Sequence, residues 1–150
     1  GVPAVGVIAC LLVMGVNFAL TREHRTFLCL SLLLGFYGFL AESMLACNGI
    51  IKYSSPFPVQ GLAPLWIVTL WMAFAGLIYP TFDWLINRPI GAAMLGAFMA
   101  PWSYYAAARL GALELSEPVL MPLVAIAAMW AVALPIAIHA RLILSRFERA

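Results

Sequence analysis

Charged side chains are scarce in this sequence. They make up 9% of its 150 residues, whereas soluble domains carry roughly a quarter. A soluble protein of this size needs a polar surface, and eight Lys and Arg with six Asp and Glu cannot form one. Because hydrophobic residues make up 65% of the chain, we expect lipid around it. The net charge of +2 is scattered, which excludes the concentrated basic face that nucleic-acid binding needs.

The sequence also lacks the motifs of common catalytic and metal sites. Its three cysteines, Cys10, Cys29 and Cys47, form no CxxC pair and have no His at ligand spacing, so we expect neither a metal nor a cofactor. There is no GxSxG, HExxH, phosphate-cradling glycine loop or SxxK sequence. We therefore expect a protein without catalytic machinery of its own.

Long apolar stretches are what the sequence has instead. A helix that spans a bilayer needs roughly 20 mostly apolar residues. Five stretches approach this length, at 2–20, 27–47, 62–79, 90–108 and 118–139, and turn residues separate them. The sequence predicts an all-α fold in which residues 1–150 form a single domain. That domain is a polytopic transmembrane bundle of about five spanning helices.

The basic residues are distributed unevenly over the connections between these stretches. If the chain crosses the membrane at each stretch, six of the eight Lys and Arg residues share one side. That side holds the first loop, the third loop and the C-terminal tail. Because short cytoplasmic loops carry an excess of Lys and Arg, the pattern predicts a cytoplasmic C-terminus and an external Gly1.

Two sets of residues are predicted to position the helices. Ala92, Gly96 and Ala100 recur every four residues in the fourth stretch, and such a stripe lets helix backbones approach closely in lipid. Trp and Arg side chains at a membrane interface bury an apolar body and keep a polar tip among the headgroups. The residues predicted as interface anchors are Trp66, Trp84, Trp102, Arg141, Arg146 and Arg149.

Glu42 is the one carboxylate inside a predicted spanning stretch. Such a group costs about 2.5 kcal/mol or more near the bilayer centre and faces the bundle rather than lipid. Arg109 ends the fourth stretch on the same side of the membrane, and Tyr105 lies one helical turn before it. We predict a partly buried ion pair between Glu42 and Arg109, with Tyr105 or Tyr104 as a hydrogen-bonding neighbour. Its role stays open between a polar clamp that joins two helices and a site for a headgroup, a substrate or a proton.

Three stretches of the chain resemble a known family. They are 41–45 (AESML), 62–75 (LAPLWIVTLWMAFA) and 101–112 (PWSYYAAARLGA). Over roughly the middle half of the chain, they are similar to domain-of-unknown-function family 2878, a family of small bacterial inner-membrane proteins. The resemblance implies an acidic residue near the position of Glu42 and an Arg at Arg109. It also implies a further hydrophobic helix before Gly1, so that this chain would be a shortened member of a six-helix protein.

One trio of this chain departs from the family pattern: it reads Tyr79-Pro80-Thr81 where the family commonly has Asn-His-Ser. The family has no assigned activity, but its members look like lipid-associated proteins, thought of alongside fatty-acyl-modifying enzymes. We expect a non-catalytic protein that contacts membrane lipid or another hydrophobic molecule and could assist a lipid-modifying enzyme. One alternative is a small accessory subunit of a membrane complex. Another is a small transporter or channel in which Glu42 couples or selects the substrate.

Overall fold

The computed structural model describes the backbone of residues 2–149. The side chains of residues 2, 3, 79, 80 and 149 are outside this description, so the predicted anchor Arg149 and most of the trio Tyr79-Pro80-Thr81 lie outside the described residues. The helices are α1 (Val2–Leu20), α2 (His24–Cys47), α3 (Leu65–Thr81), the short 3-10 helix η1 (Asp83–Leu85), α4 (Pro89–Arg109) and α5 (Leu120–Arg149).

The helix bounds differ from the predicted stretches at α2, which begins at His24 and not at residue 27, and at α3 and α5. The third stretch was predicted to begin at residue 62, but α3 begins at Leu65, directly after Pro64, whose ψ of 152° is extended. A proline disfavours helix in the residue before it, which explains the later start. The fifth stretch was predicted to end at residue 139, but α5 continues to Arg149. The C-terminal tail is therefore part of the last helix.

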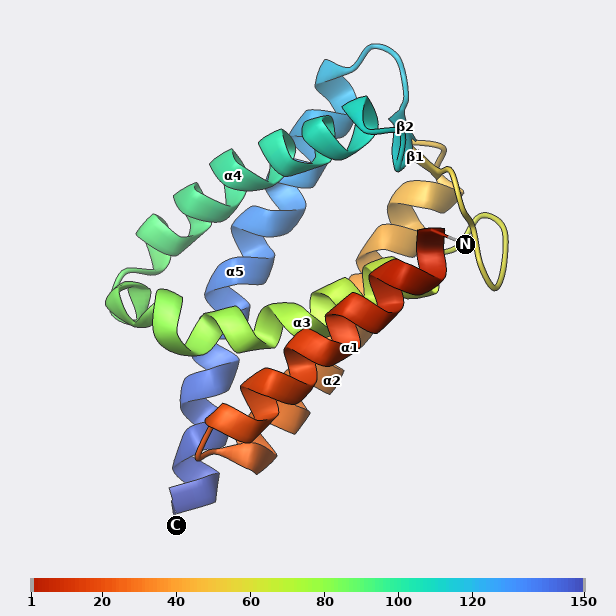
Figure 1. Cartoon of the computed structure of the whole chain (residues 1–150). Coiled ribbons are helices and arrows are strands. Elements are labelled where there is room, and N and C mark those ends of the chain that lie inside the picture. Colours follow the sequence, from red (N-terminus) through yellow and green to blue (C-terminus); the bar gives the residue numbers. More distant parts are fainter. Residues whose placement is uncertain (1, 150) are drawn as a thin grey trace.

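The five long helices form two groups, which meet mainly where α2 packs on α5. In the first group α3 packs on both α1 and α2, and in the second α4 packs along α5. Figure 1 shows α4 beside the upper part of α5, with α1 and α2 on the other side of α3. Contacts between α2 and α5 join the two groups. This arrangement brings side chains of α1, α3, α4 and α5 around one space, which is described below.

A small β-ribbon is the one element within the described residues that the predicted helical fold did not include. Strand β1 (Ile51–Tyr53) pairs antiparallel with β2 (Leu113–Leu115), so that Ile51 faces Leu115 and Tyr53 faces Leu113. Side chains alternate across a strand, and Ile51, Tyr53 and Leu113 are buried while Lys52 is exposed. The ribbon ties the connection between α2 and α3 to the connection between α4 and α5.

The other end of the molecule is held together by the last helix. Arg141 of α5 pairs with Asp83 between α3 and α4. Glu148 of α5 accepts hydrogen bonds from the backbone N–H groups of Arg25 and Thr26 at the start of α2. The first connection, the third connection and the tail therefore share one end, and the ribbon marks the opposite end (Figure 1).

Two helices within residues 2–149 are long and apolar enough to cross a membrane, namely His24–Cys47 and Leu120–Glu148. The apolar helices Ala4–Leu20 and Leu65–Ile78 are shorter. Large hydrophobic side chains are exposed on every long helix, such as Leu20 (78%), Ile90 (76%) and Phe147 (78%). The mostly helical fold is confirmed, and two of its helices have the length and composition of membrane spans. Five separate spans remain a prediction.

Candidate functional site

Glu42 lies at the centre of a buried cluster of hydrogen bonds. Its side chain is 0% exposed. The Tyr53 hydroxyl donates to Oε2 at 2.5 Å, and Trp71 Nε1 donates to Oε1 at 2.9 Å. The Tyr104 hydroxyl also donates to Oε1. One carboxylate therefore joins four elements, because its partners come from β1, α3 and α4.

A glycine one turn earlier on α2 makes room for the indole ring in this cluster. Gly38 and Glu42 are four residues apart and share a helix face. A Cβ atom at Gly38 would lie 2.3 Å from Cγ of Trp71, so only glycine allows the ring this close. The ring of Tyr37 packs edge-on against Trp71, with centroids 5.5 Å apart. The backbone of α2 thus fixes the direction in which Trp71 presents its N–H to Glu42.

Every hydrogen bond to Glu42 comes from a neutral group. Among the side chains that the structure describes, no Lys, Arg or His forms an ion pair with it. Burial raises the pKa of the Tyr53 hydroxyl far above its ordinary value, and the neighbouring charge and hydrogen bond of Glu42 add to the rise. Tyr53 therefore keeps its proton and remains a donor. Three hydrogen bonds from neutral donors therefore satisfy the side chain of Glu42 without a cation.

The predicted ion pair between Glu42 and Arg109 is wrong. Arg109 is the last residue of α4 and is exposed, and no ion pair within the described part of the chain joins it to Glu42. Tyr105 shares a helix face with Arg109, as the spacing predicts, but it is 40% exposed and faces outward. Tyr104 is the residue of this group that reaches Glu42. Five residues rotate a helix by about 140° from Tyr104 to Arg109, so one helix cannot present both side chains to one carboxylate.

Two members of the cluster were not predicted. Tyr53 lies in a segment that the sequence presents as a loop, and Trp71 was expected only to fill space. The sequence carries no local signal for either contact, since Tyr53 is 11 and Trp71 is 29 residues away from Glu42. A general rule could have found them: an intramembrane carboxylate without a nearby cation needs other donors.

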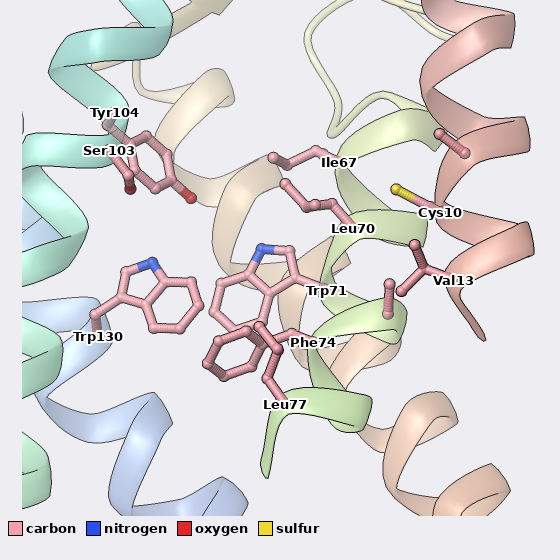
Figure 2. A pocket seen from close by; sticks show the side chains of 12 residues that line it. Cys10, Val13, Ile67, Leu70, Trp71, Phe74, Leu77, Ser103, Tyr104 and Trp130 are labelled. Atoms are coloured by element: carbon pink, nitrogen blue, oxygen red, sulfur yellow. The ribbon is translucent and has the colours of Figure 1, made fainter. Parts of the chain in front are cut away.

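An apolar cavity of about 430 Å³ lies directly beside the cluster. Figure 2 shows Tyr104 and Ser103 of α4 and Trp130 of α5 facing Trp71 and Phe74 of α3. No charged side chain lines the cavity, whose lining residues are Ala9, Cys10, Val13, Ile67, Leu70, Trp71, Ala73, Phe74, Leu77, Ser103, Tyr104 and Trp130. Trp71 and Tyr104 belong to both sets. A single layer of side chains therefore separates the cavity from Glu42.

A second apolar cavity, of about 340 Å³, adjoins the first. The two cavities share Phe74, Ser103 and Trp130 as lining residues. The Trp130 ring stacks on Trp71 with centroids 4.3 Å apart and meets Phe74 edge-on at 5.2 Å. Phe74 and Trp130 thus line both cavities, and their contacts with Trp71 join them to the cluster.

The small-residue stripe lies between α4 and α5. Ala92 is 1% exposed and Ala100 is 7% exposed. A Cβ atom at Gly96 would lie 2.3 Å from the backbone oxygen of Trp130, so the two helix backbones approach closely at this point. Close contact here fixes the position of Trp130 and, with it, one wall of the first cavity.

The three tryptophans predicted as interface anchors differ in exposure. Trp84 is 59% exposed and Trp102 is 62% exposed, so both rings lie on the outer surface of the protein. Trp66 is half-buried, and its ring packs edge-on against Tyr53 with centroids 5.9 Å apart. Trp66 therefore supports the cluster around Glu42 as well as the end of its helix.

The predicted arginine anchors also differ in exposure. Arg146 is exposed near the end of α5. The Arg141 side chain is only 14% exposed and pairs with Asp83. The charge of Arg141 therefore holds α5 to the third connection, and its role as an anchor among headgroups stays a prediction.

Comparison with known proteins identifies a family but no activity. The sequence profile of a family described as a protein of unknown function (DUF2878) matches residues 1–136. The chain belongs to this family. The match extends the resemblance beyond the middle half of the chain and includes Glu42, Tyr53, Trp71 and Tyr104. No curated protein matches the chain, and no solved structure does.

Proposed function

We propose that this chain is a non-catalytic protein of the bacterial inner membrane that holds the apolar chain of a lipid or of another hydrophobic molecule. The observation that carries the proposal is the cavity of about 430 Å³ between α1, α3, α4 and α5. Ligand pockets have volumes of roughly 300–1,000 Å³ and mostly apolar linings with few polar groups. The cavity beside Trp71 and Tyr104 fits both properties.

The surface around the cavity favours a ligand that comes from the membrane. Three of its lining residues are also exposed on the outside of the helices: Val13 (51%), Leu70 (49%) and Leu77 (52%). The lining is thus continuous with the apolar outer surface. A lipid chain lying against α1 and α3 can enter sideways without crossing water, and its reactive end can then be presented to a lipid-modifying enzyme.

In this proposal all five long helices span the membrane. The end that carries Arg25, Arg88 and Arg146 faces the cytoplasm, and the β-ribbon faces the outside. Support comes from the excess of basic residues at the first end and from the contacts that gather the connections into two groups. The shorter helices α1 and α3 fit the bilayer because neighbouring helices and local thinning accommodate short spans.

Photochemical labelling tests the proposal at the level of single residues. The purified protein in lipid nanodiscs is incubated with a fatty chain that carries a diazirine, irradiated, and mapped by peptide mass spectrometry. We expect adducts on the α3 segment around Leu70 and Phe74 that an excess of unlabelled chain removes. Adducts on outward residues such as Leu32, which is 63% exposed, should persist, because bulk lipid contacts them without a defined site.

Two matched variants show whether the removable adducts form in the cavity or on the outer surface. Cys10 lines the cavity, whereas Cys29 is exposed on α2. Cys10→Phe should fill the cavity and abolish the removable adducts, and Cys29→Phe should leave them unchanged. Labelling that no unlabelled chain can displace, or equal labelling of the two variants, contradicts the proposal.

A second candidate function rests on α1. One side of this helix exposes apolar residues along its whole length, including Val5 (67%), Leu12 (65%) and Leu20 (78%). A larger membrane protein could cover this surface, which would make the chain an accessory subunit. Stoichiometric co-purification of another membrane protein, lost on substitution of Leu12 by Asn, would support this function. A transporter role has less support, since Glu42 lines neither of the two cavities described above.

A further inference from the structure

A third cavity, of about 440 Å³, lies at the end of the molecule that carries the β-ribbon. Its lining comes from Gly6 of α1, Trp66 of α3, Ser54 and Ser55 after β1, and the turn at 110–112 before β2. We infer that this cavity is the headgroup subsite for the chain held in the first cavity, and that it takes an uncharged headgroup that carries hydroxyl groups, such as glycerol or a sugar. The inference rests on the proposed function, because it adds the polar end of the same ligand.

The first and third cavities follow one another along the same two helices. On α1 the lining passes from Gly6 in the third cavity to Ala9 and Cys10 in the first. On α3 it passes from Trp66 to Ile67. One helical turn rises about 5.4 Å, so the two linings are at most about one turn apart on either helix. One extended molecule can therefore occupy both cavities.

The distance along α3 matches the depth of one lipid leaflet. Leu77 also lines the first cavity, and a rise of 1.5 Å per residue places it roughly 16 Å from Trp66. The hydrocarbon core of a bilayer is about 30 Å thick, so one leaflet is about 15 Å deep. In the proposed orientation the ribbon faces the outside, which places the third cavity among the headgroups and the first among the chains. A lipid of the outer leaflet fits both without turning over.

The polar groups in the lining of the third cavity are neutral. They include the hydroxyl groups of Ser54 and Ser55 and the indole N–H of Trp66, none of which forms a hydrogen bond within the described part of the chain. A hydroxyl group donates once and accepts twice, whereas an indole only donates. A few such groups fix the orientation of a ligand in an otherwise apolar site. The hydroxyl groups of a polyol, which both donate and accept, match this set.

A charged headgroup would find no partner in this cavity. None of the described residues that line it is Asp, Glu, Lys, Arg or His. Arg109 precedes the turn at 110–112 but is not part of the lining, and Lys52 in the ribbon pairs with Glu114. A charge that leaves water without a partner is costly. We therefore expect carboxylate and ammonium groups to gain nothing from this site.

Competition against the diazirine probe tests the headgroup. The competitors share one chain length and end in a glycerol ester, a glucoside, a methyl ester, a carboxylate or an amine, each added to the protein in nanodiscs of neutral lipid. Removal of the adducts around Phe74 is measured relative to the persistent adducts on the outer surface. We expect the glycerol ester or the glucoside to act at about tenfold lower concentration than the methyl ester, since a few new hydrogen bonds correspond to about this factor. The stronger of the two identifies the headgroup as glycerol or sugar, and the carboxylate and the amine should act no better than the methyl ester.

Substitutions assign this preference to the third cavity. Ser54→Ala combined with Ser55→Ala removes both hydroxyl groups and should reduce the tenfold difference to about twofold or less. Ser116→Ala is the matched control and should preserve it, because Ser116 lies at the same end but lines neither cavity. Ala112→Phe should fill the third cavity and abolish the preference, while the chain probe still labels the region of Phe74.

A second probe tests the orientation of the ligand. A glycerol ester with its diazirine beside the ester group should label the turn at 110–112, and the same ester with the diazirine at the chain end should label the region of Leu77. Labelling in the reverse order overturns the inference. Equal competition by the methyl ester and the two polyols, or an unchanged preference in the double serine variant, also overturns it and leaves the proposed function intact. Absence of any removable adduct overturns both.

Discussion

Glu148, near the end of the last helix, accepts a hydrogen bond of 2.8 Å from the backbone N–H of Thr26, which lies 122 residues earlier. Its second oxygen accepts from the N–H of Arg25 at 3.0 Å. The first N–H groups of a helix have no partner within the helix, and a carboxylate there also compensates the positive end of the helix dipole. The C-terminal end of α5 thus caps α2, and it replaces a local cap, because Glu23 forms no side-chain cap.

Removal of this long-range cap should lower thermal stability. Glu148→Gln keeps the shape of the side chain but loses its charge and one of its two acceptor oxygens, so we expect a measurably lower melting temperature in mild detergent. Glu114→Gln is the control. Glu114 pairs with Lys52 at 3.4 Å, but both side chains are at least 70% exposed, and exposed pairs contribute little. Equal melting temperatures for the two variants would show that α5 does not hold the start of α2.

The contact between α4 and α5 should tolerate no added methyl group. Gly96→Ala places a carbon 2.3 Å from the backbone oxygen of Trp130, and overpacking of this kind costs about 1–3 kcal/mol. At Gly15 of α1 nothing lies within 4 Å of an added Cβ, so Gly15→Ala should be neutral or slightly stabilising. Denaturant unfolding of both variants in micelles measures the difference. A Gly96→Ala protein as stable as the wild type would contradict the close approach of the two helices.

The donors around Glu42 should depend on one another. Tyr53→Phe deletes the hydroxyl that binds Oε2 and should cost about 0.5–2 kcal/mol. Glu42→Leu leaves three buried donors without an acceptor, and we expect a loss of about 3 kcal/mol or more. In the Glu42→Leu background Tyr53→Phe should restore stability, because it removes one unsatisfied hydroxyl. Tyr105→Phe is the matched control and should have little effect, since this ring is 40% exposed.

The decisive result is whether the effect of Tyr53→Phe on stability changes sign when Glu42 is replaced by Leu. If Tyr53→Phe is equally harmful with and without Glu42, the phenol acts through packing alone. The cluster would then be a set of unrelated contacts, and the carboxylate would not join β1, α3 and α4.

Much of the helical fold could be predicted because hydrophobicity is a local signal. The stretches 2–20 and 90–108 differ from α1 and α4 by no more than one residue at either end, since Pro89 and the Arg22 region mark their boundaries. The special status of Glu42 was also predictable, because a carboxylate inside an apolar helix needs a buried partner. These conclusions need only neighbouring residues along the chain.

The partners of Glu42 could not be predicted in the same way, because they depend on contacts between distant segments. The ribbon forms between two tripeptides, IKY and LEL, that are too short to show strand periodicity. Without the ribbon nothing brings Tyr53 toward α2. Charge alone points to Arg109 as the partner of Glu42. In the structure, however, hydroxyl and indole groups donate the hydrogen bonds that satisfy this carboxylate. The rotation of α4 decided between Tyr104 and Tyr105, and sequence spacing does not fix rotation.

The most direct test of the proposed membrane topology is the accessibility of the two ends of the molecule from either side of a native membrane. Cys10, Cys29 and Cys47 are replaced by Ser, and a single cysteine is introduced at Ser54 beside the ribbon or at Asn87 in the third connection, both of which are exposed. Cells are treated with a membrane-impermeant thiol reagent before and after permeabilisation of the inner membrane. The proposed membrane topology predicts that Ser54→Cys reacts in both conditions and that Asn87→Cys reacts only after permeabilisation. Reaction of both positions from the same side, or recovery of the protein in the aqueous fraction without amphiphile, would contradict it.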